Sequence, residues 1–308
     1  LVLSNNSFLT KTLFEIMTLK IEFNDKHFAN RKRNPVEFKE IASEIRRDII
    51  KMLVLAKSGH SGGPLGLSDI MAVLFFGGFL RYKPGQPDWK ERDRFILSAG
   101  HLCPVHYSAL ARAGFFPIEE LSTLRKWGTR LQGHPALDKN LPGIETAAGS
   151  LGQGISIAVG MAMSDKLLDK NDRKVFAITG DGELQEGSCW EAAMAAANYH
   201  LDNLCWIVDN NDCQIDGRVR DVMSVYPLAE KFLSFGFNVV EIDGHNFDDI
   251  IKTFGQFLKL NADNSGKPFC IIAKTYMGEG VSFMKDQYIW HGNPPNEEQA
   301  KLALDEII

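Results

Sequence analysis

Short runs of β-branched and aromatic residues recur along the chain, and longer stretches with helical character separate them. Such runs are typical of strands in a parallel sheet, which are hydrophobic on both faces. Strands that alternate with helices predict an α/β fold with a mainly parallel central sheet and helices on both faces. The predicted strands span residues 94–98, 175–179, 204–208, 237–241 and 269–273.

The first long helix is predicted to open at Pro35, because proline suits the first turn of a helix. The glycine-rich segment 58–64 is predicted to follow its end, and Ser68 is the expected N-cap of the next helix. Residues 1–34 lack a sustained period and are predicted to form a loosely ordered arm, which leaves residues 35–308 as one domain. The apolar face of the first helix consists of Phe38, Ile41, Ile45, Ile49 and Met52.

The composition allows a full hydrophobic core, because 44% of the 308 residues are hydrophobic and the net charge is −5. The mildly acidic balance gives no basis for nucleic-acid binding. Five cysteines without a CxxC pair suggest neither a disulfide framework nor a zinc site, and they indicate the cytoplasm. No apolar run reaches the roughly 20 residues that a membrane span needs. Since the chain opens on Leu1, Met17 is a candidate for the true start.

The most informative segment lies between residues 175 and 213. Asp181 stands between Gly180 and Gly182 where a predicted strand ends, and Asn211 follows the next strand thirty positions later. Polar groups at the carboxyl ends of strands form ligand sites in open α/β sheets. Glycines let the main chain approach a diphosphate, and a helix N-terminus favours the anion. Because carboxylate and amide oxygens suit Mg²⁺ or Ca²⁺, the spacing predicts a metal and diphosphate site.

Four histidines lie beside glycine in predicted loops. Imidazole is suited both to proton transfer and to hydrogen bonding with phosphate or hydroxyl groups. One such histidine alone is typical of a turn, but four at the ends of predicted elements favour a functional site. These four are His60, His101, His134 and His291. The others are interpreted as structural, namely His27, His106, His200 and His245.

Six segments of the chain occur in the same order as in transketolases, and they cover roughly residues 36–300. The chain therefore resembles the N-terminal half of a transketolase, which has the thiamine diphosphate-binding fold. The segments are SGHSGGPLGLSDI, RDRFILSAGH, QGHP, PGIETAAGSLGQGISIAVGMA, GDGELQEGSCWEA and DNNDCQIDG.

This resemblance implies thiamine diphosphate as the cofactor, bound together with Mg²⁺ or Ca²⁺. The side chains of Asp181 and Asn211 would bind the metal, and Cys213 would bind it through its main-chain carbonyl. Two diphosphate oxygens and a water molecule would complete an octahedron. The main-chain amide of Gly182 would contact the diphosphate. Asp212 and Cys213 are uncommon choices after the metal-binding asparagine of the family, but a carbonyl ligand tolerates the change of side chain.

The remaining cofactor contacts would come from loops. His101 and His291 would hydrogen-bond the diphosphate oxygens, and Ile215 would pack on the thiazolium ring. Transketolases usually have proline at the position of Ser150, so this loop is expected to be looser here. The segment that would lie against the aminopyrimidine ring consists of Gly149, Ser150 and Leu151.

The resemblance also implies roles toward the substrate. His60 and His134 would hold substrate hydroxyls and move protons, and His101 and His291 would complete the catalytic set. Glu186 resembles a carboxylate that links two active sites across a dimer. Its alternative role is that of an acidic residue in the first turn of a helix, where the helix dipole favours it. The implied reaction is two-carbon ketol transfer from a ketose phosphate to an aldose phosphate.

The chain stops near the end of the cofactor-binding region of a transketolase. The rest of such an enzyme supplies further residues for the cofactor and the sugar phosphate. The chain is therefore predicted to be the N-terminal subunit of a split transketolase, completed by a separate C-terminal subunit in a two-plus-two heterotetramer and inactive without it. A fragment of a longer protein is the alternative.

Three other functions are alternatives to this prediction. A 1-deoxyxylulose-5-phosphate synthase shares the GDG and asparagine pattern, but the SGHSGGPLG and QGHP segments favour transketolase. A transketolase-like enzyme acting on another sugar is a second alternative. A non-catalytic assembly subunit is a third, and the retained Asp181, Asn211 and loop histidines argue against it.

Overall fold

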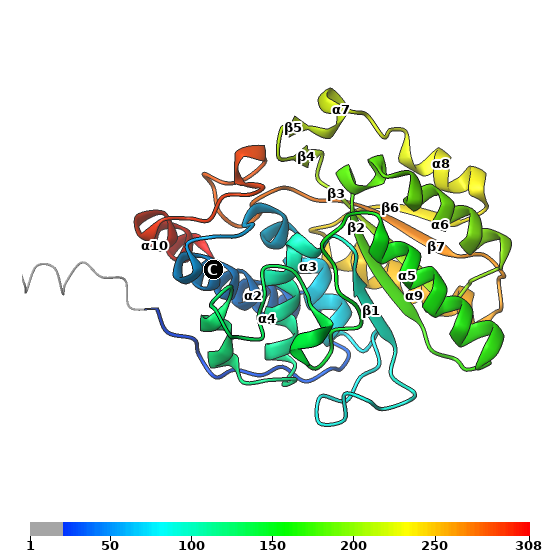
Figure 1. Ribbon diagram of the computed structural model, residues 1–308, viewed down its shortest axis with the longest axis horizontal. Coiled ribbons are helices and arrows are strands. Elements are labelled where there is room, and N and C mark those ends of the chain that lie inside the picture. Colours follow the sequence, from blue (N-terminus) through cyan, green and yellow to red (C-terminus); the bar gives the residue numbers. More distant parts are fainter. Residues whose placement is uncertain (1–20) are drawn as a thin grey trace, which may run out of the picture.

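The computed structural model describes residues 21–308, and its centre is a sheet of five parallel strands in the order β1-β2-β3-β7-β6 (Figure 1). Each strand lies within two residues of its prediction, which confirms the α/β fold with a mainly parallel sheet. The strands are β1 (Arg94–Leu97), β2 (Val175–Gly180), β3 (Leu204–Asn210), β6 (Asn238–Asp243) and β7 (Phe269–Lys274).

Helices cover both faces of the sheet. Successive side chains of a strand point to opposite faces, so apolar strand residues need a helix layer on each side. Phe176 and Ile178 belong to the core on one face, whereas Ala177 between them belongs to the core on the other. The first face is covered by α2 (Pro35–Ala56), α3 (Gly62–Phe76), α4 (Cys103–Arg112) and α9 (Phe247–Ala262). The second is covered by α5 (Gln153–Met163), α6 (Gly187–Asn198) and α8 (Leu228–Phe235).

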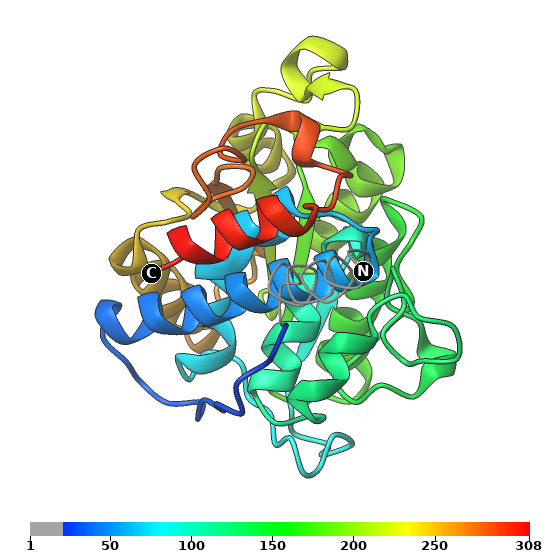
Figure 2. The ribbon, with the colours of Figure 1, turned by 90° about the vertical axis from the view of Figure 1, so that its left-hand side faces the viewer.

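Two peripheral elements extend these layers. Helix α10 (Glu297–Glu306) lies against α2, as Figure 2 shows in red and blue. The short hairpin of β4 (Cys213–Gln214) and β5 (Gly217–Arg218) leads into α7 (Val219–Val222) and projects at the top of Figure 1. Since the hairpin follows the carboxyl end of β3, it lies on the side of the sheet where a ligand site is expected.

The start of α3 differs from the sequence prediction. The helix begins at Gly62 with Ser61 as its N-cap, so Ser68 lies in its interior and donates a hydrogen bond to the carbonyl of Pro64. Glycines and a proline are compatible with a first helical turn, whose N–H groups have no partner within the helix. The glycines here serve close packing, because a Cβ at Gly63 would lie 2.4 Å from Leu102.

Residues 21–34 contain no helix or strand, yet they are hydrogen-bonded to the domain. The main-chain N–H of Phe28 donates to the carbonyl of Arg112, and the Arg112 guanidinium donates to the carbonyls of Asn24 and Lys26. The opposite side of that guanidinium pairs with Asp48 of α2, and both side chains are fully buried. The first part of the predicted arm and the candidate start at Met17 lie outside the described residues.

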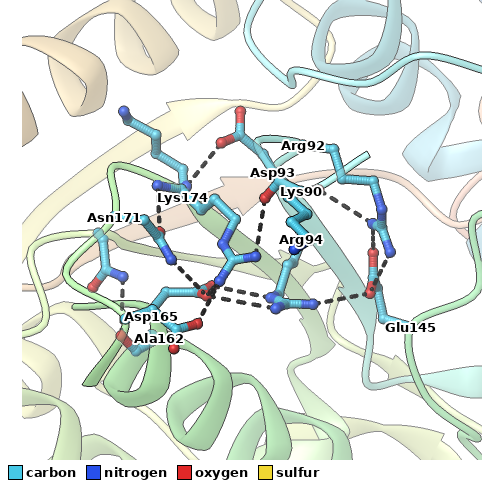
Figure 3. Close-up of polar contacts among 12 residues, drawn as sticks. Lys90, Arg92, Asp93, Arg94, Glu145, Ala162, Asp165, Asn171 and Lys174 are labelled. Carbon is cyan, nitrogen blue, oxygen red and sulfur yellow. Dashed lines mark hydrogen bonds and ion pairs between the residues drawn. The ribbon is translucent and has the colours of Figure 1, made fainter. Parts of the chain in front are cut away.

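A network of ion pairs connects α5 to the long irregular loop that precedes it (Figure 3). Asp165 is fully buried in a π-helical turn that continues α5, and it accepts hydrogen bonds from Arg94 at 3.0 Å and from Asn171 at 3.3 Å. Arg94 also lies 3.6 Å from Glu145, which pairs with Arg92. The network therefore anchors the loop shortly before the Gly149 segment.

His106 of α4 is fully buried, and neither of its ring nitrogens has a hydrogen-bond partner among residues 21–308. Its ring meets Phe95 edge-on, with 4.7 Å between the centroids, and Phe75 lies 6.0 Å away. Burial lowers the pKa of His106 from 6.5 to about 3. The sequence interpretation of this histidine as structural fits an aromatic role in the core.

Replacing His106 with phenylalanine is expected to raise the free energy of unfolding by about 1 kcal/mol at pH 7, because two unpaired polar atoms leave the core. A small void beside Phe95 and Pro135 adjoins the ring. The folded-state pKa lies below the unfolded one, so the wild type loses stability as the pH falls from 6.5 toward 3. Urea unfolding between pH 7 and 4 should show a flatter profile for the variant, and an unchanged profile would contradict this account.

Candidate active site

The sequence-predicted residues meet around one cavity of about 310 Å³ at the carboxyl ends of the strands. Its wall is formed by the ends of β2 and β3, the start of the β4–β5 hairpin and three loops. The lining residues are His60, Gly63, His101, Leu102, His134, Gly149, Leu151, Gly180, Asp181, Gly182, Glu183, Gln185, Asp209, Asn211, Cys213, Gln214, Ile215, Asp216, Met277 and His291.

The four loop histidines converge on this cavity although up to 231 positions separate them in the sequence. His60 is central, with its ring centroid 5.0 Å from that of His101, 5.6 Å from His291 and 6.3 Å from His134. The centroids of His101 and His291 are 5.0 Å apart. Four imidazoles on one wall provide several hydrogen-bonding atoms that face a ligand of the size of the cavity.

All four imidazoles are held in the neutral form at pH 7. Burial and the neighbouring histidines lower the pKa of His60 to about 4, and burial lowers the pKa of His101 well below its usual value. Burial also lowers the pKa of His134 and of His291, with Arg125 acting on His134. Neutral imidazoles can accept hydrogen bonds and protons, which suits hydroxyl groups and reacting oxygens.

Another part of the cavity wall carries carboxylates and amides from the ends of β2 and β3. One Asp181 oxygen accepts the main-chain N–H of Gly182 at 2.8 Å, and the other accepts that of Asp212 at 2.6 Å. The Asn211 side chain donates to Asp209 and accepts the N–H of Cys213 at 2.9 Å. Burial and the nearby Asp209 raise the pKa of Asp181 to about 7. A buried carboxyl group of this kind gains from a cation beside it.

Glu183 is a site residue to which the sequence reasoning assigned no role. It is buried at the cavity floor and accepts hydrogen bonds from the Ser98 hydroxyl and from the main-chain N–H groups of Gly152 and Gly180. These partners end β1, precede α5 and end β2, so one carboxyl group joins three segments. Burial raises the pKa of Glu183 to about 7, while the three hydrogen bonds oppose the shift.

Replacing Glu183 with glutamine is expected to lower the free energy of unfolding by about 2 kcal/mol, because in either amide orientation an NH₂ group faces a main-chain N–H. Chemical denaturation at pH 7.5 measures this effect. Glu191→Gln on the exposed side of α6 is the matched control and should change stability by less than about 0.5 kcal/mol. Equal stability of the two variants would show that the Glu183 bonds contribute nothing.

Some of the other predicted site residues line the cavity and some do not. Gly149, Leu151 and Ile215 line the cavity, and the Ile215 side chain is 64% exposed at its rim. Ser150 and Glu186 are exposed and do not line the cavity. Glu186 is the N-cap of α6, one position before the first helical turn that the alternative role names, and its side chain forms no capping hydrogen bond. Asp209 and Met277 line the cavity but were missed, because an aspartate or methionine at a strand end carries no specific motif.

The donor set fits the cofactor and metal that the resemblance implies. Asp181, Asn211 and Cys213 face one cavity, and the Nδ1 atoms of His60 and His291 are buried without a partner in the described part of the chain. Residues 21–308 contain no group of three or more His, Cys, Asp or Glu side chains that could hold a metal ion. The implied metal set includes only one such side chain, since its other two donors are an amide and a main-chain carbonyl.

Comparison with known proteins agrees with this geometry. Residues 38–306 match the family model described as the thiamine diphosphate-binding domain of transketolase. An apulose-4-phosphate transketolase subunit of Phocaeicola vulgatus is 40% identical over 273 residues, which are 88% of this chain and 94% of that protein. A 6-deoxy-6-sulfo-D-fructose transketolase subunit of Clostridium is 39% identical, with 88% of this chain and 96% of the relative covered.

Complete transketolases match over a smaller share of their own length. Human transketolase is 39% identical over 271 residues, which are 87% of this chain and 42% of the human protein. The crystal structure of Campylobacter jejuni transketolase superposes with a TM-score of 0.82 at 35% identity, covering 89% of this chain and 43% of that one. This chain therefore spans less than half the length of these enzymes.

The fold and the cavity define a thiamine diphosphate-binding domain of the α/β class. The chain belongs to the transketolase family of transferases, and it corresponds to the N-terminal half of the complete enzymes. The predicted family and its thiamine diphosphate-binding fold are thus confirmed. Within residues 21–308 no helix combines the length and apolar character needed to cross a membrane.

Proposed function

We propose that this chain is the cofactor-binding subunit of a split transketolase and acts with Mg²⁺ in two-carbon ketol transfer between sugar phosphates. The observation that carries the proposal is the convergence of four neutral histidines with Asp181, Asn211 and Cys213 around one cavity. One wall suits a metal-bound diphosphate and the other suits substrate hydroxyls. A non-catalytic assembly role would need neither arrangement.

The acidic wall would hold the metal and the diphosphate. Asp181 and Asn211 would contribute side-chain oxygens, and Cys213 its carbonyl oxygen, to a magnesium ion that prefers oxygen donors. Ca²⁺ accepts the same donors and is the alternative ion. The raised pKa of Asp181 supports the proposal, because a cation would compensate a carboxylate that burial otherwise disfavours. The main-chain amide of Gly182 would donate to the diphosphate.

The histidine wall would handle hydroxyls and protons. Thiamine diphosphate, when bound, would supply the nucleophilic carbon for addition to a ketose carbonyl and the electron sink for breaking the adjacent carbon–carbon bond. His60 and His134 would hold the substrate hydroxyls and accept or return a proton there, because both are neutral at pH 7. His101 and His291 would hydrogen-bond the diphosphate, and either would stabilise charge that develops on a nearby oxygen.

The loops at the rim would complete the cofactor pocket. Gly149, Ser150 and Leu151 would lie against the aminopyrimidine ring through their main chain, and Ile215 would pack on the thiazolium ring. Glu186, exposed at the start of α6, would face a second copy of the chain and take part in a chain of acids between two sites. Residues 1–34 would be an N-terminal arm that precedes the cofactor-binding domain of residues 35–308, with residues 21–34 hydrogen-bonded to that domain.

A separate C-terminal subunit would supply the missing wall. This view is supported by the two relatives called transketolase subunits, of which this chain covers 94% and 96%, and by the 42% coverage of the human enzyme. We propose a two-plus-two heterotetramer in the cytoplasm that is inactive without the partner. The sugars in the names of these two relatives, apulose 4-phosphate and 6-deoxy-6-sulfo-D-fructose, favour another sugar as the second candidate substrate.

The test is ketol transfer from xylulose 5-phosphate to ribose 5-phosphate with thiamine diphosphate and Mg²⁺. It compares this chain alone, the C-terminal transketolase half from the same genome, and their mixture. Activity only in the mixture is the expected result. Activity of this chain alone would contradict the shared site. Inactivity of the mixture with these sugars and with the two alternative sugars would contradict the proposed reaction.

A further inference from the structure

Arg125 lies outside the cavity wall but between two of the loops that carry its histidines. A Cβ built on Gly133, which precedes His134, would lie 2.6 Å from both Cζ and Nε of Arg125. A Cβ on Gly59, which precedes His60, would lie 3.6 Å from the same Nε. The planar guanidinium therefore occupies the space that Gly133 leaves open. At Gly59 the nearest atom is Cδ2 of Leu53, at 2.6 Å, and the guanidinium is in ordinary contact beside it.

The charge of Arg125 is not compensated by an acid. Its side chain donates a hydrogen bond from Nη1 to the Ser58 hydroxyl at 2.9 Å, and in the described chain no carboxylate oxygen lies within 4.0 Å of it. Arg130 in the same loop contrasts with it, because that guanidinium donates to both Glu120 oxygens at 2.8 and 2.7 Å. Arg125 therefore carries a positive charge beside neutral histidines and has no carboxylate partner. In this it differs from the arginines whose ion pairs stabilise the fold.

The main chain at Arg125 is also held in an unusual conformation. Its φ is +58°, the left-handed region that non-glycine residues rarely adopt and that costs of the order of 1 kcal/mol or more. The conformation is maintained by a hydrogen bond from the Arg125 N–H to the Leu131 carbonyl at 2.8 Å. The side chain of Arg125 is half-buried, with its guanidinium against Gly133.

We infer that Arg125 is a positioning residue that holds the His60 and His134 turns at a fixed separation and keeps an uncompensated positive charge behind both imidazoles. The catalytic meaning of this inference rests on the proposed function, in which two neutral histidines accept hydrogen bonds from the hydroxyl groups of a sugar. The packing of the guanidinium against the glycines is independent of that function.

The burial of the two imidazoles and the charge of Arg125 both lower the pKa of His60 and of His134. A positive charge disfavours the protonated imidazole, so Arg125 lowers the pKa of His60 and of His134. The other groups that face His60 are His101, His291 and His134, and none of them is acidic. No carboxylate therefore opposes the arginine among the groups that act on the pKa of either histidine, and its charge adds to burial in favouring the neutral imidazoles.

The test follows the histidine C2 protons by NMR between pH 4 and 8 in the isolated chain without cofactor. Arg125→Met removes the charge at similar length, and we expect the pKa of His60 and of His134 to rise by about half a unit or more. Arg125→Lys should keep most of the lowering because it keeps the charge. Lys126→Met is the matched control, since it removes an exposed charge from the same loop and should shift neither histidine.

The outcomes separate this inference from the proposed function. Unchanged pKa values in Arg125→Met, or an equal shift in Lys126→Met, would overturn the role of Arg125 whatever the enzyme does. If the shift occurs, kcat/KM of the reconstituted enzyme should fall about tenfold in Arg125→Met. The acidic limb of its pH profile should move to higher pH, and Arg125→Lys should restore part of the activity. A shifted histidine pKa in a chain whose reconstituted complex never transfers ketol groups would instead contradict the proposed function alone.

Discussion

An Asp181→Ala variant is expected to lose magnesium-dependent binding of thiamine diphosphate. Removing an outer partner of a metal ligand typically costs 10- to 100-fold in affinity, so loss of the single carboxylate ligand should cost about 1,000-fold, or about 4 kcal/mol. The measurement is isothermal titration of thiamine diphosphate into the reconstituted complex with Mg²⁺. Ketol transfer should fall by a similar factor.

Stability distinguishes this loss from unfolding. Without metal, burial and Asp209 disfavour the Asp181 carboxylate, whereas the hydrogen bonds from Gly182 and Asp212 favour it. The alanine variant should therefore stay folded at pH 8, with a free energy of unfolding within about 2 kcal/mol of the wild type. Asp221→Ala, which removes an exposed carboxylate from α7, is the matched control and should bind the cofactor normally. Cofactor affinity of Asp181→Ala within threefold of the wild type would exclude Asp181 as the metal ligand.

An Asp48→Ala variant is expected to lose about 3 to 5 kcal/mol of unfolding free energy. Asp48 accepts hydrogen bonds from Nε and Nη2 of Arg112 at 2.8 and 2.6 Å and from Ser108 at 2.7 Å. In the variant, the fully buried Arg112 guanidinium would keep its positive charge. The Glu44 carboxylate lies farther away, at 3.6 Å, and would compensate this charge only in part. Urea denaturation of the isolated chain measures the loss.

The same helix offers the control for this prediction. Glu40 of α2 pairs with Lys26, and both side chains are about half exposed, at 58% and 46%. Water screens such a pair, so Glu40→Ala should cost less than about 1 kcal/mol. A loss in Asp48→Ala no larger than that in Glu40→Ala would show that the buried pair does not stabilise the native state.

Hydrophobic pattern alone determined the fold. Four of the five strands are recognisable because they are buried on both faces and are therefore largely apolar, whereas β6 at the sheet edge is partly exposed and is marked mainly by its β-branched residues. The alternation with helices implies parallel pairing. The GDG motif and Asn211 could be placed at one site because parallel strands end at the same edge of the sheet. The loop histidines could be selected as candidates because glycine and proline mark the loops.

Sequence pattern could not determine contacts through space. The glycines of segment 58–64 suggest a loop, whereas in the fold Gly62 and Gly63 form the first turn of α3, with Gly63 packed tightly on Leu102. Glu183 joins three segments, yet nothing in its neighbours along the chain indicates Ser98 or Gly152 as partners.

Charge environment was likewise decided only by the tertiary structure. Arg125 has the same charge as Arg130 in sequence, but the fold gives Arg130 an acid and places Arg125 against a pair of glycine turns. His106 resembles the site histidines by residue type, but burial between two phenylalanines makes it part of the core. The local sequence pattern shows which surface of a segment is apolar. The ion-pair partner of a side chain and the pKa of an ionisable group depend instead on neighbours that only chain folding brings together.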